Sequence, residues 1–372
     1  MLSCNPAMVC NPLPVPPPPD SLIQKVTTMK FAICQEMYEK TDWATQCRLI
    51  AEAGYAGIEV APFTISTDLA SVPVSVFHEM KQEAEQHGLE IIGLHWLLAK
   101  TTGLYLTSPE PAVRKATADY LALLARICRQ LGGHIMVFGS PQQRTLLPGI
   151  SKAQAAEFAA DVFRQAAPVF ADNQVLLCLE PLTLKETDFI NTCDEALEII
   201  RMVDHPSMAL HQDVKAMLGA ESSPIPKIIA RHKKNCKHFH VNDSNLLGPG
   251  MGSTDYHPIL RALIESNYSG WVSVEVFDYS PGAQNIAVQS LNYMRSVALA
   301  HGGNVGVSCE AGVTSFWFDD DRLEVAFRQV LRHVHPVPGN NVLIRTVSIS
   351  IQYFDFEIVV ADNTVVLVIL NH

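Results

Sequence analysis

Short apolar runs alternate with longer segments of helical periodicity over residues 30–303 of this chain. This alternation is typical of βα units, in which each strand is followed by a helix and the strands form a parallel sheet. Eight apolar runs predict eight strands, at residues 31–34, 57–61, 89–95, 134–139, 175–180, 208–213, 236–241 and 271–276.

The segments between the apolar runs carry signals for the start and end of helices. Ser108 followed by Pro109 predicts the start of one helix, and Gly132 predicts its end. Ser151 together with Gln154 has the spacing of a capping box and predicts the start of the next helix.

Eight strand and helix pairs can close into a barrel that leaves no strand edge unpaired, whereas an open sheet would have two edges to protect. The sequence therefore predicts an α/β fold with a single (β/α)8 TIM barrel. Such barrels commonly occupy about 250 residues as one domain.

The two ends of the chain depart from this pattern. Residues 1–28 hold the run Pro16 to Pro19 and further prolines, which predicts a disordered Pro-rich tail. Residues 29–303 form the predicted barrel domain. Residues 304–372 predict a C-terminal extension, with β structure over residues 347–370 around a turn at 361–364. No chemistry is evident in the extension.

Composition and charge restrict the class of partner. With a formal net charge of -11 and no long basic run, the chain lacks the clustered lysine and arginine that a nucleic acid requires. Its nine cysteines occur singly, which favours reduced thiols in a cytoplasmic protein. No apolar stretch is long enough to cross a membrane, and no export signal is evident at the N-terminus.

Four titratable residues stand at or near the ends of the last four predicted strands: Glu180, Asp213, His240 and Glu275. They follow one another roughly every 30 residues, about one βα unit. Because function in such barrels lies at the carboxyl ends of the strands, we expect these side chains to converge at one mouth of the barrel.

Three carboxylates and one imidazole held this close would repel one another unless a divalent cation neutralised them. Oxygen-rich ligation with one imidazole suits Mn²⁺ best, with Mg²⁺ or Co²⁺ as alternatives. A single acid at a strand end is more often a helix cap or a surface group. Four on consecutive strands favour a metal site.

Around these residues the sequence resembles the xylose-isomerase-like TIM barrel superfamily, and within it the sugar phosphate isomerase/epimerase branch that includes the ketose 3-epimerases. The resemblance covers about residues 29–303 and rests on Leu-Glu-Pro-Leu, Leu-His-Gln-Asp-Val, His-Val-Asn-Asp-Ser and Val-Glu-Val. It implies that Glu180, Asp213, His240 and Glu275 hold one divalent cation. It also implies that Glu180 and Glu275 are catalytic and move protons on opposite faces of a ketose.

The reaction that this resemblance implies is isomerisation or epimerisation of a sugar or sugar derivative, by proton transfer through a metal-stabilised enediolate. The physical logic agrees, because a proton next to a carbonyl is too weakly acidic for a carboxylate alone and a Lewis acid stabilises the enediolate. General base catalysis adds roughly 10² to 10⁴-fold.

Two further residues are candidates for substrate binding. Glu186 matches a position that in the ketose 3-epimerases contacts substrate and orients a catalytic glutamate, although a solvated loop charge is an equal alternative. His95 ends the third strand and points to the same mouth, where it could hydrogen-bond a sugar hydroxyl. Its alternative is a histidine whose partners lie within the protein, beneath Trp96.

The chain also departs from the ketose 3-epimerases at two substrate-contacting positions. Ala216 stands where those enzymes carry histidine, and Leu246 stands where they carry arginine. Lys215 and Arg144 are the candidate replacements for holding a charged or hydroxyl-rich substrate group, and Lys215 has the alternative of pointing outward. These departures put specificity for a free ketohexose in doubt.

Several rival functions remain open at this point. A metal-dependent dehydratase of an inosose-like or dehydroshikimate-like substrate would use similar enolate chemistry, and a non-catalytic barrel could serve as a binding protein. A two-metal hydride-shift isomerase lacks assignable second-site ligands, and the acidic charge disfavours a DNA-repair endonuclease. We expect a small-molecule carbohydrate as partner, neither nucleic acid nor membrane, and leave a homo-oligomer open.

Overall fold

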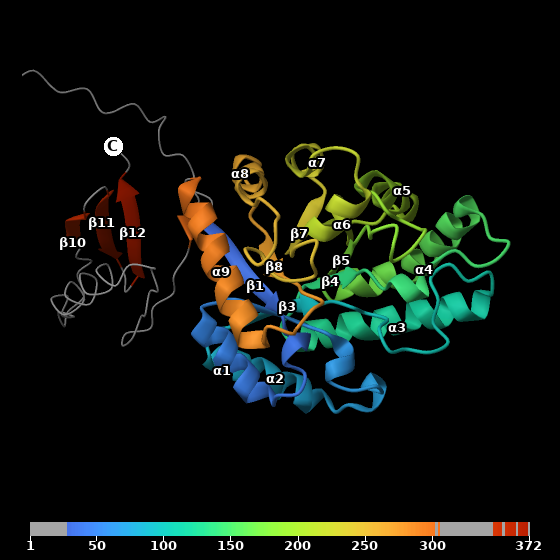
Figure 1. Cartoon of the computed structure of the whole chain (residues 1–372). Helices are drawn as coiled ribbons and strands as arrows, with labels where there is room; N and C mark the ends of the chain where they lie inside the picture. The colour runs from blue at the N-terminus through green and yellow to red at the C-terminus, as the bar shows by residue number, and fades with distance from the viewer. Residues whose placement is uncertain (1–27, 302–303, 306–344, 352–353, 362–363, 371–372) are drawn as a thin grey trace, which may run out of the picture.

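Eight parallel strands form a closed ring in the computed structural model, which describes residues 28–301, 304–305, 345–351, 354–361 and 364–370 (Figure 1). Each strand pairs with its neighbours in chain order, and β1 closes the ring by pairing with both β2 and β8. The predicted TIM barrel is confirmed. The strands are β1 (Thr28–Cys34), β2 (Gly57–Val60), β3 (Glu90–Leu94), β4 (Ile135–Phe138), β5 (Leu176–Leu179), β6 (Met208–Asp213), β7 (Cys236–Val241) and β8 (Trp271–Val274).

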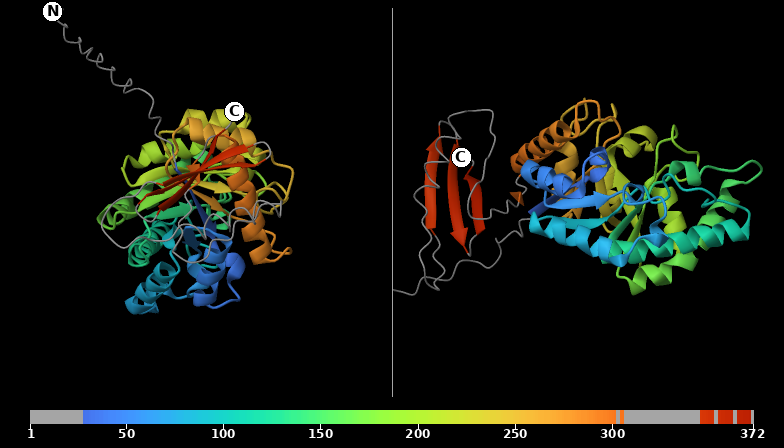
Figure 2. Two further views of the ribbon diagram at one scale, coloured as in Figure 1. Left: turned by 90° about the vertical axis from the view of Figure 1, so that its left-hand side faces the viewer. Right: turned by 90° about the horizontal axis from the view of Figure 1, so that it is seen from below.

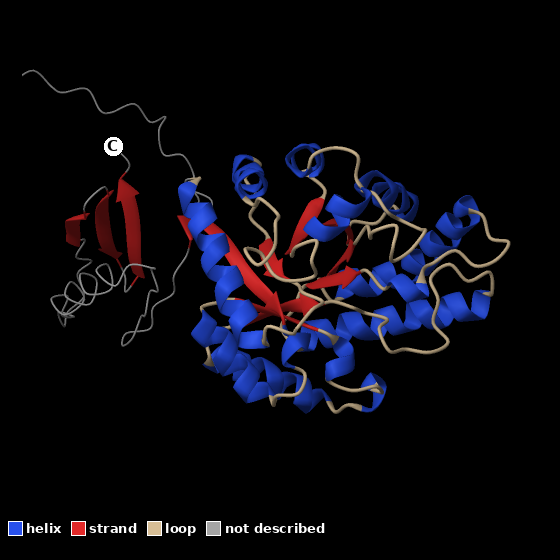
Figure 3. Ribbon diagram, in the orientation of Figure 1, coloured by secondary structure: helices blue, strands red, loops and turns tan. Residues whose placement is uncertain are grey.

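Helices surround the eight strands of the ring, which lie inside, as the colouring in Figure 3 and the two further views in Figure 2 make plain. A helix follows each of the eight strands of the ring, so the chain direction repeats in each unit and these strands all end at the same mouth of the barrel. The helices are α1 (Trp43–Ala53), α2 (Val74–Gln86), α3 (Pro111–Gln130), α4 (Lys152–Asp172), α5 (Cys193–Val203), α6 (Val214–Ala220), α7 (Ile225–His232), α8 (His257–Glu265) and α9 (Ala283–Ala300).

Of the two predicted helix starts, one is confirmed and one is wrong. Ser151 caps α4 in a complete capping box with Gln154, as expected. The start predicted at Ser108 and Pro109 is wrong, because α3 begins at Pro111. The Ser108 hydroxyl instead accepts a hydrogen bond from the backbone N–H of Glu110 in the turn before the helix. Pro111 occupies the first helical position, where a residue needs no N–H partner.

Alternation along the strands separates two buried layers. Phe138 of β4 packs edge-to-face on Phe163 of α4, with ring centroids 5.3 Å apart, so it belongs to the apolar layer between strands and helices. Val137 therefore points into the ring. On β6 the same alternation places Ala209, His211 and Asp213 on one face, and His211 is fully buried. The ring interior thus becomes polar toward the carboxyl ends.

The end regions are described only in part. The C-terminal strands β10 (Arg345–Ile351), β11 (Phe354–Ala361) and β12 (Thr364–Leu370) form an antiparallel sheet where β structure was expected, and β9 (Asn304–Val305) pairs with the start of β1. Residues 1–27 lie outside the described residues, so the disordered tail and the two boundaries between the three predicted segments stay predictions. No helix within the described part of the chain has the length and apolar character to span a membrane.

Candidate metal centre at the barrel mouth

The four side chains predicted from the sequence converge at one point. Glu180 directly follows β5, Asp213 ends β6, His240 lies in β7 and Glu275 directly follows β8. Each offers one ligand atom, and these four atoms all lie within 4.8 Å of one another. All four side chains are buried. The fold therefore brings together a compact set of three carboxyl groups and one imidazole.

Local features of the chain shape this set. Gly139, just after β4, has no side chain, and a Cβ atom there would lie 2.3 Å from Oε2 of Glu180. Glycine is therefore needed for the Glu180 carboxyl to occupy its position. Asp213 caps α6 by accepting the backbone N–H of Ala216 at 2.6 Å, and its second oxygen accepts the side-chain amide of Asn242 at 2.6 Å. These bonds hold the Asp213 carboxylate in one orientation.

His240 lies between two carboxylates. Its Nδ1 is 3.2 Å from Oε2 of Glu275, and its Nε2 is 3.1 Å from Oε1 of Glu59. Glu59 belongs to β2, on a distant part of the ring, and is fully buried. The imidazole thus connects the candidate ligand set to a second, deeper carboxylate.

The pKa values of the carboxyl groups reflect how close their like charges lie to one another. Burial, together with the nearby charges of Glu275 and Asp213, raises the pKa of Glu180 well above its ordinary value. Burial likewise raises the pKa of Asp213 to about 6, although Lys215 acts in the opposite direction. For Glu275, burial alone would raise the pKa, but His240 outweighs it and the net pKa is lowered. The cluster holds more negative charge than its own cations neutralise.

A layer of ionisable groups beneath the set was missed in the sequence. Glu59, His211 and His238 are fully buried in the ring interior, and Nε2 of His238 lies 2.6 Å from Oε1 of Glu59. Although burial raises the pKa of Glu59, His238 and His240 outweigh it and keep that pKa low. Strand alternation was the available signal, because His211 and His238 stand two residues before Asp213 and His240 and so share their face.

His95 lies in the site, but both its ring nitrogens face carboxylates. Nδ1 is 3.3 Å from Oε1 of Glu275, and Nε2 is 3.0 Å from Oε2 of Glu36, a buried glutamate that sequence reasoning also missed. The His95 side chain is fully buried. These contacts favour a histidine that positions Glu275 over one that binds a sugar hydroxyl.

Glu186 and Lys215 form an ion pair near the set. Nζ of Lys215 donates to Oε1 of Glu186 at 2.8 Å and lies 3.7 Å from the centre of the Phe277 ring. The other Glu186 oxygen accepts from the backbone and hydroxyl of Thr183. Burial lowers the pKa of Lys215, but Asp213 and Glu186 outweigh it and the net pKa is raised. Lys215 therefore points inward and stays charged, which excludes its outward-facing alternative.

Arg144 takes a different position from the one expected. Its guanidinium group is fully buried and donates to the backbone carbonyls of Glu180 and Ile190, at 2.6 and 2.9 Å. Because two of its nitrogens are directed at main-chain oxygens, Arg144 supports the segment that carries Glu180. The geometry does not favour the direct substrate contact that the sequence suggested.

Aromatic side chains from three loops at the carboxyl ends lie beside one another. Trp96 stacks on Phe277 with ring centroids 6.0 Å apart, and Phe63 lies 5.9 Å from Trp96. All three are partly exposed. Trp96 has a backbone φ of 51°, an unusual conformation for a tryptophan, and it directly follows His95. These rings form an apolar wall of the kind on which a sugar face can stack.

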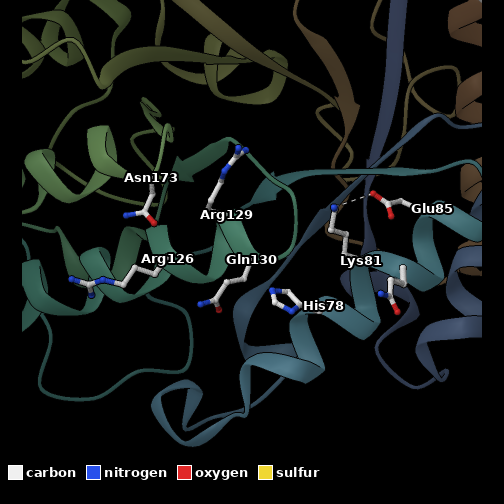
Figure 4. A pocket seen from close by; sticks show the side chains of 8 residues that line it. His78, Lys81, Glu85, Arg126, Arg129, Gln130 and Asn173 are labelled. Atoms are coloured by element: carbon white, nitrogen blue, oxygen red, sulfur yellow. Dashed lines mark ion pairs between the residues drawn. The ribbon is translucent and has the colours of Figure 1, made fainter.

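A surface cavity of about 620 Å³ lies elsewhere, between α2 and α3 on the outer side of the barrel (Figure 4). Its lining includes Lys81, Arg126 and Arg129, and Lys81 pairs with Glu85 of the same helix at 3.2 Å. None of its lining residues lies at the carboxyl end of a strand. This cavity is therefore separate from the candidate metal centre.

Comparison with known proteins agrees with the fold. The family model for xylose isomerase-like TIM barrels matches residues 47–297 of the 372. The chain belongs to this family. Within the xylose isomerase-like barrels it is 27% identical over 259 residues to a D-psicose 3-epimerase of Ruminiclostridium cellulolyticum, covering 67% of this chain and 84% of the relative.

Two further similarities point the same way. Fructoselysine 3-epimerase of Escherichia coli O157:H7 is 22% identical, over 61% of this chain and 82% of its own length. The crystal structure of D-psicose 3-epimerase with D-tagatose from Clostridium cellulolyticum H10 superposes with a TM-score of 0.65 at 23% identity, covering 72% of this chain and 99% of that one. The relatives are epimerases, which supports an isomerase or epimerase enzyme on this xylose isomerase-like barrel.

Proposed function

We propose that this chain is a divalent-metal-dependent epimerase that inverts the carbon next to the carbonyl of a ketose or ketose derivative. The observation that carries the proposal is the convergence of Glu180, Asp213, His240 and Glu275, with ligand atoms within 4.8 Å of one another. The two relatives named above act on different compounds, but both are 3-epimerases, which supports carbon 3 as the reacting centre.

The residues present fit a divalent cation. Three buried carboxyl groups and an imidazole form an oxygen-rich donor set. The raised pKa of Glu180 indicates that a nearby positive charge would stabilise its carboxylate. Such a set suits Mn²⁺, with Mg²⁺ or Co²⁺ as alternatives. When bound, the cation would act as a Lewis acid toward the substrate's carbonyl and adjacent hydroxyl oxygens.

The two glutamates are the proposed proton carriers. Glu180 and Glu275 follow the first and last of the four ligand-bearing strands, β5 and β8, so they flank the set from its two sides. One carboxylate takes the proton from the carbon, leaving the electron pair in the substrate enediolate. The other carboxyl group returns a proton to the opposite face, so the carbon is inverted and no atom is gained or lost.

The surrounding residues support a sugar as substrate without fixing which one. The wall of Phe63, Trp96 and Phe277 suits the apolar face of a sugar, and the Lys215–Glu186 pair suits its hydroxyl groups. Ala216 and Leu246 replace two polar positions of the ketose 3-epimerases. We therefore propose a substrate different from a free ketohexose in the part that those positions would contact.

The compartment is also a proposal. The six cysteines within the described residues are all free thiols and all buried. Reduced thiols are the usual state in the cytoplasm, which supports that location.

The test is solvent deuterium incorporation into a panel of ketoses, aldoses and inososes, with Mn²⁺, with a chelator, and with the variant Glu275→Gln. Exchange at a single carbon that requires metal and is lost in Glu275→Gln is the expected result. Glu265→Gln, at an exposed position on α8, is the matched control and should exchange as the wild type does.

Product analysis of the same reactions separates the epimerase from its rival. Loss of water from an inosose would reassign the chain as a dehydratase. Absence of exchange on every compound, despite stoichiometric metal binding, would favour a binding protein.

A further inference from the structure

Glu59 is a buried carboxylate that the proposed reaction does not use. It lies in β2, while the candidate ligands lie on or directly after β5 to β8. Its side chain is fully buried in the ring interior, and both its oxygens face histidines of β7. Burying a charged group is costly unless it is paired, so this position calls for an explanation.

The contact with His240 supplies one. Nε2 of His240 lies 3.1 and 3.2 Å from the two oxygens of Glu59, while Nδ1 of the same ring faces Glu275. A neutral imidazole carries its proton on one of its two nitrogens. Glu275 is a candidate metal ligand and Glu59 is not, so the proton belongs on Nε2, the nitrogen that faces Glu59. A ligand nitrogen must be unprotonated, and Nδ1 is the nitrogen on the side of the candidate ligand set.

We infer that Glu59 is a positioning residue for the metal centre: it accepts the Nε2 proton of His240, and thereby fixes the ring orientation and leaves Nδ1 as the ligand atom. This inference rests on the proposed function, because it assumes that His240 binds the cation. A carboxylate behind a ligating histidine also makes that ligand more basic, and its loss typically weakens metal binding by about 10- to 100-fold.

The rival role for Glu59 is to neutralise His238. Nε2 of His238 is 2.6 Å from Oε1 of Glu59, a shorter contact than that of His240. His238 is absent from the group of four candidate ligands, although it belongs to a second group with His211 and His240. If Glu59 served His238 alone, removing either residue would affect stability and leave the metal centre unchanged.

The first experiment measures Mn²⁺ affinity by calorimetry on the metal-stripped full chain, in the wild type, Glu59→Gln, Glu59→Asp and His238→Gln. We expect one site per chain, about 10- to 100-fold weaker binding in Glu59→Gln, partial rescue in Glu59→Asp, and an affinity within about threefold of the wild type in His238→Gln. The absorption spectrum of bound Co²⁺ should change in Glu59→Gln and stay the same in His238→Gln.

The outcomes distinguish failure of the proposed function from failure of the role assigned to Glu59. A wild type that binds no divalent cation would overturn the proposed function and the inference with it. A wild type that binds Mn²⁺, with equal affinity in a folded Glu59→Gln, would overturn the inference alone. Binding of two ions, with one lost in His238→Gln, would make Glu59 part of a second site and also overturn it.

A measurement on the wild type covers the case in which Glu59→Gln does not fold. Nitrogen-15 NMR of histidine side chains in the Mg²⁺-loaded protein reports which ring nitrogen of His240 carries the proton, with His240→Gln used for assignment. We expect the proton on Nε2. A proton on Nδ1 would contradict the inference directly.

Discussion

At the scale of single residues, the candidate centre depends on side chains that hold one another in place. Asp213 is fixed by Ala216 and Asn242, and Glu275 is flanked by His95 and His240. A ligand or proton carrier that is held by two contacts loses little freedom when a cation or substrate arrives. Small changes next to these residues should therefore affect chemistry more than stability.

Gly139→Ala tests this view, because the added Cβ would lie 2.3 Å from Oε2 of Glu180. We expect the Glu180 carboxyl to be displaced and the turnover number to fall by about 10²-fold, since a shift of about 1 Å at a reacting group has effects of that size. Steady-state kinetics on the substrate found by deuterium exchange would measure it. Glu265→Gln, at an exposed position on α8, is again the control and should leave turnover unchanged. Unchanged turnover in Gly139→Ala would contradict the assigned role of Glu180.

Replacing the proton carriers separately gives the second prediction. Glu180→Gln and Glu275→Gln should each lower kcat by about 10² to 10⁴-fold, because general acid–base catalysis contributes that much. If each glutamate serves one face, a variant should lose exchange from one epimer more than from the other. Deuterium exchange run from both epimers would reveal this asymmetry, and equal residual exchange from both in each variant would argue against two separate carriers.

At the scale of elements, strands and helices were predictable because each carries its own signal. The apolar runs placed all eight strands, and Ser151 capped α4 as expected. The helix start predicted at Ser108 and Pro109 failed because Pro111, two residues after Pro109, offers a competing first position. Local propensity alone does not resolve the two.

The candidate ligands were predictable for the same reason, since they stand at strand ends that the pattern defines. Glu59 and Glu36 were not, because their partners are far away in the chain and no local pattern joins them. The contacts of Arg144 were not predictable, because sequence cannot tell whether a loop arginine points at substrate or at backbone carbonyls. These contacts form only when the folded ring brings distant parts of the chain together.

The capping box of α4 yields a prediction about stability. Ser151→Ala removes the hydroxyl that accepts the backbone N–H of Gln154, and should lower the free energy of unfolding by about 1 kcal/mol. Urea denaturation would measure it. Ser296→Ala, on an exposed face of α9, is the control and should leave stability unchanged or slightly higher. A drop in Mn²⁺ affinity in Ser151→Ala would show unexpected coupling of α4 to the centre.

At the scale of the whole molecule, pH should link metal binding to stability. Glu180 and Asp213 have raised pKa values, Asp213 at about 6, and a cation requires both carboxyls deprotonated. Metal affinity should therefore rise as pH increases through about 6, with release of protons.

The same raised pKa values determine how the stability of the metal-free protein changes with pH. A carboxyl group whose pKa is raised in the folded state binds more protons in that state than in the unfolded state. Its contribution to stability is therefore lost as pH rises from about 4, the pKa in the unfolded state, through the pKa in the folded state. Mn²⁺ should consequently raise Tm more at pH 8 than at pH 5.5. Calorimetric melting with and without metal would measure this, and an increase independent of pH would contradict the assignment.

Closure of the ring has a consequence for how the protein acquires its site. Glu59 and His95 come from the first half of the barrel, while their partner His240 lies in β7 and their partner Glu275 directly follows β8, the last strand of the ring to be synthesised. Until β8 pairs with β1, these early groups face an interior without the residues that neutralise them, and burying them is costly. Folding intermediates should therefore stay open and hydrated at this end, so that completing the barrel and completing the site are one event.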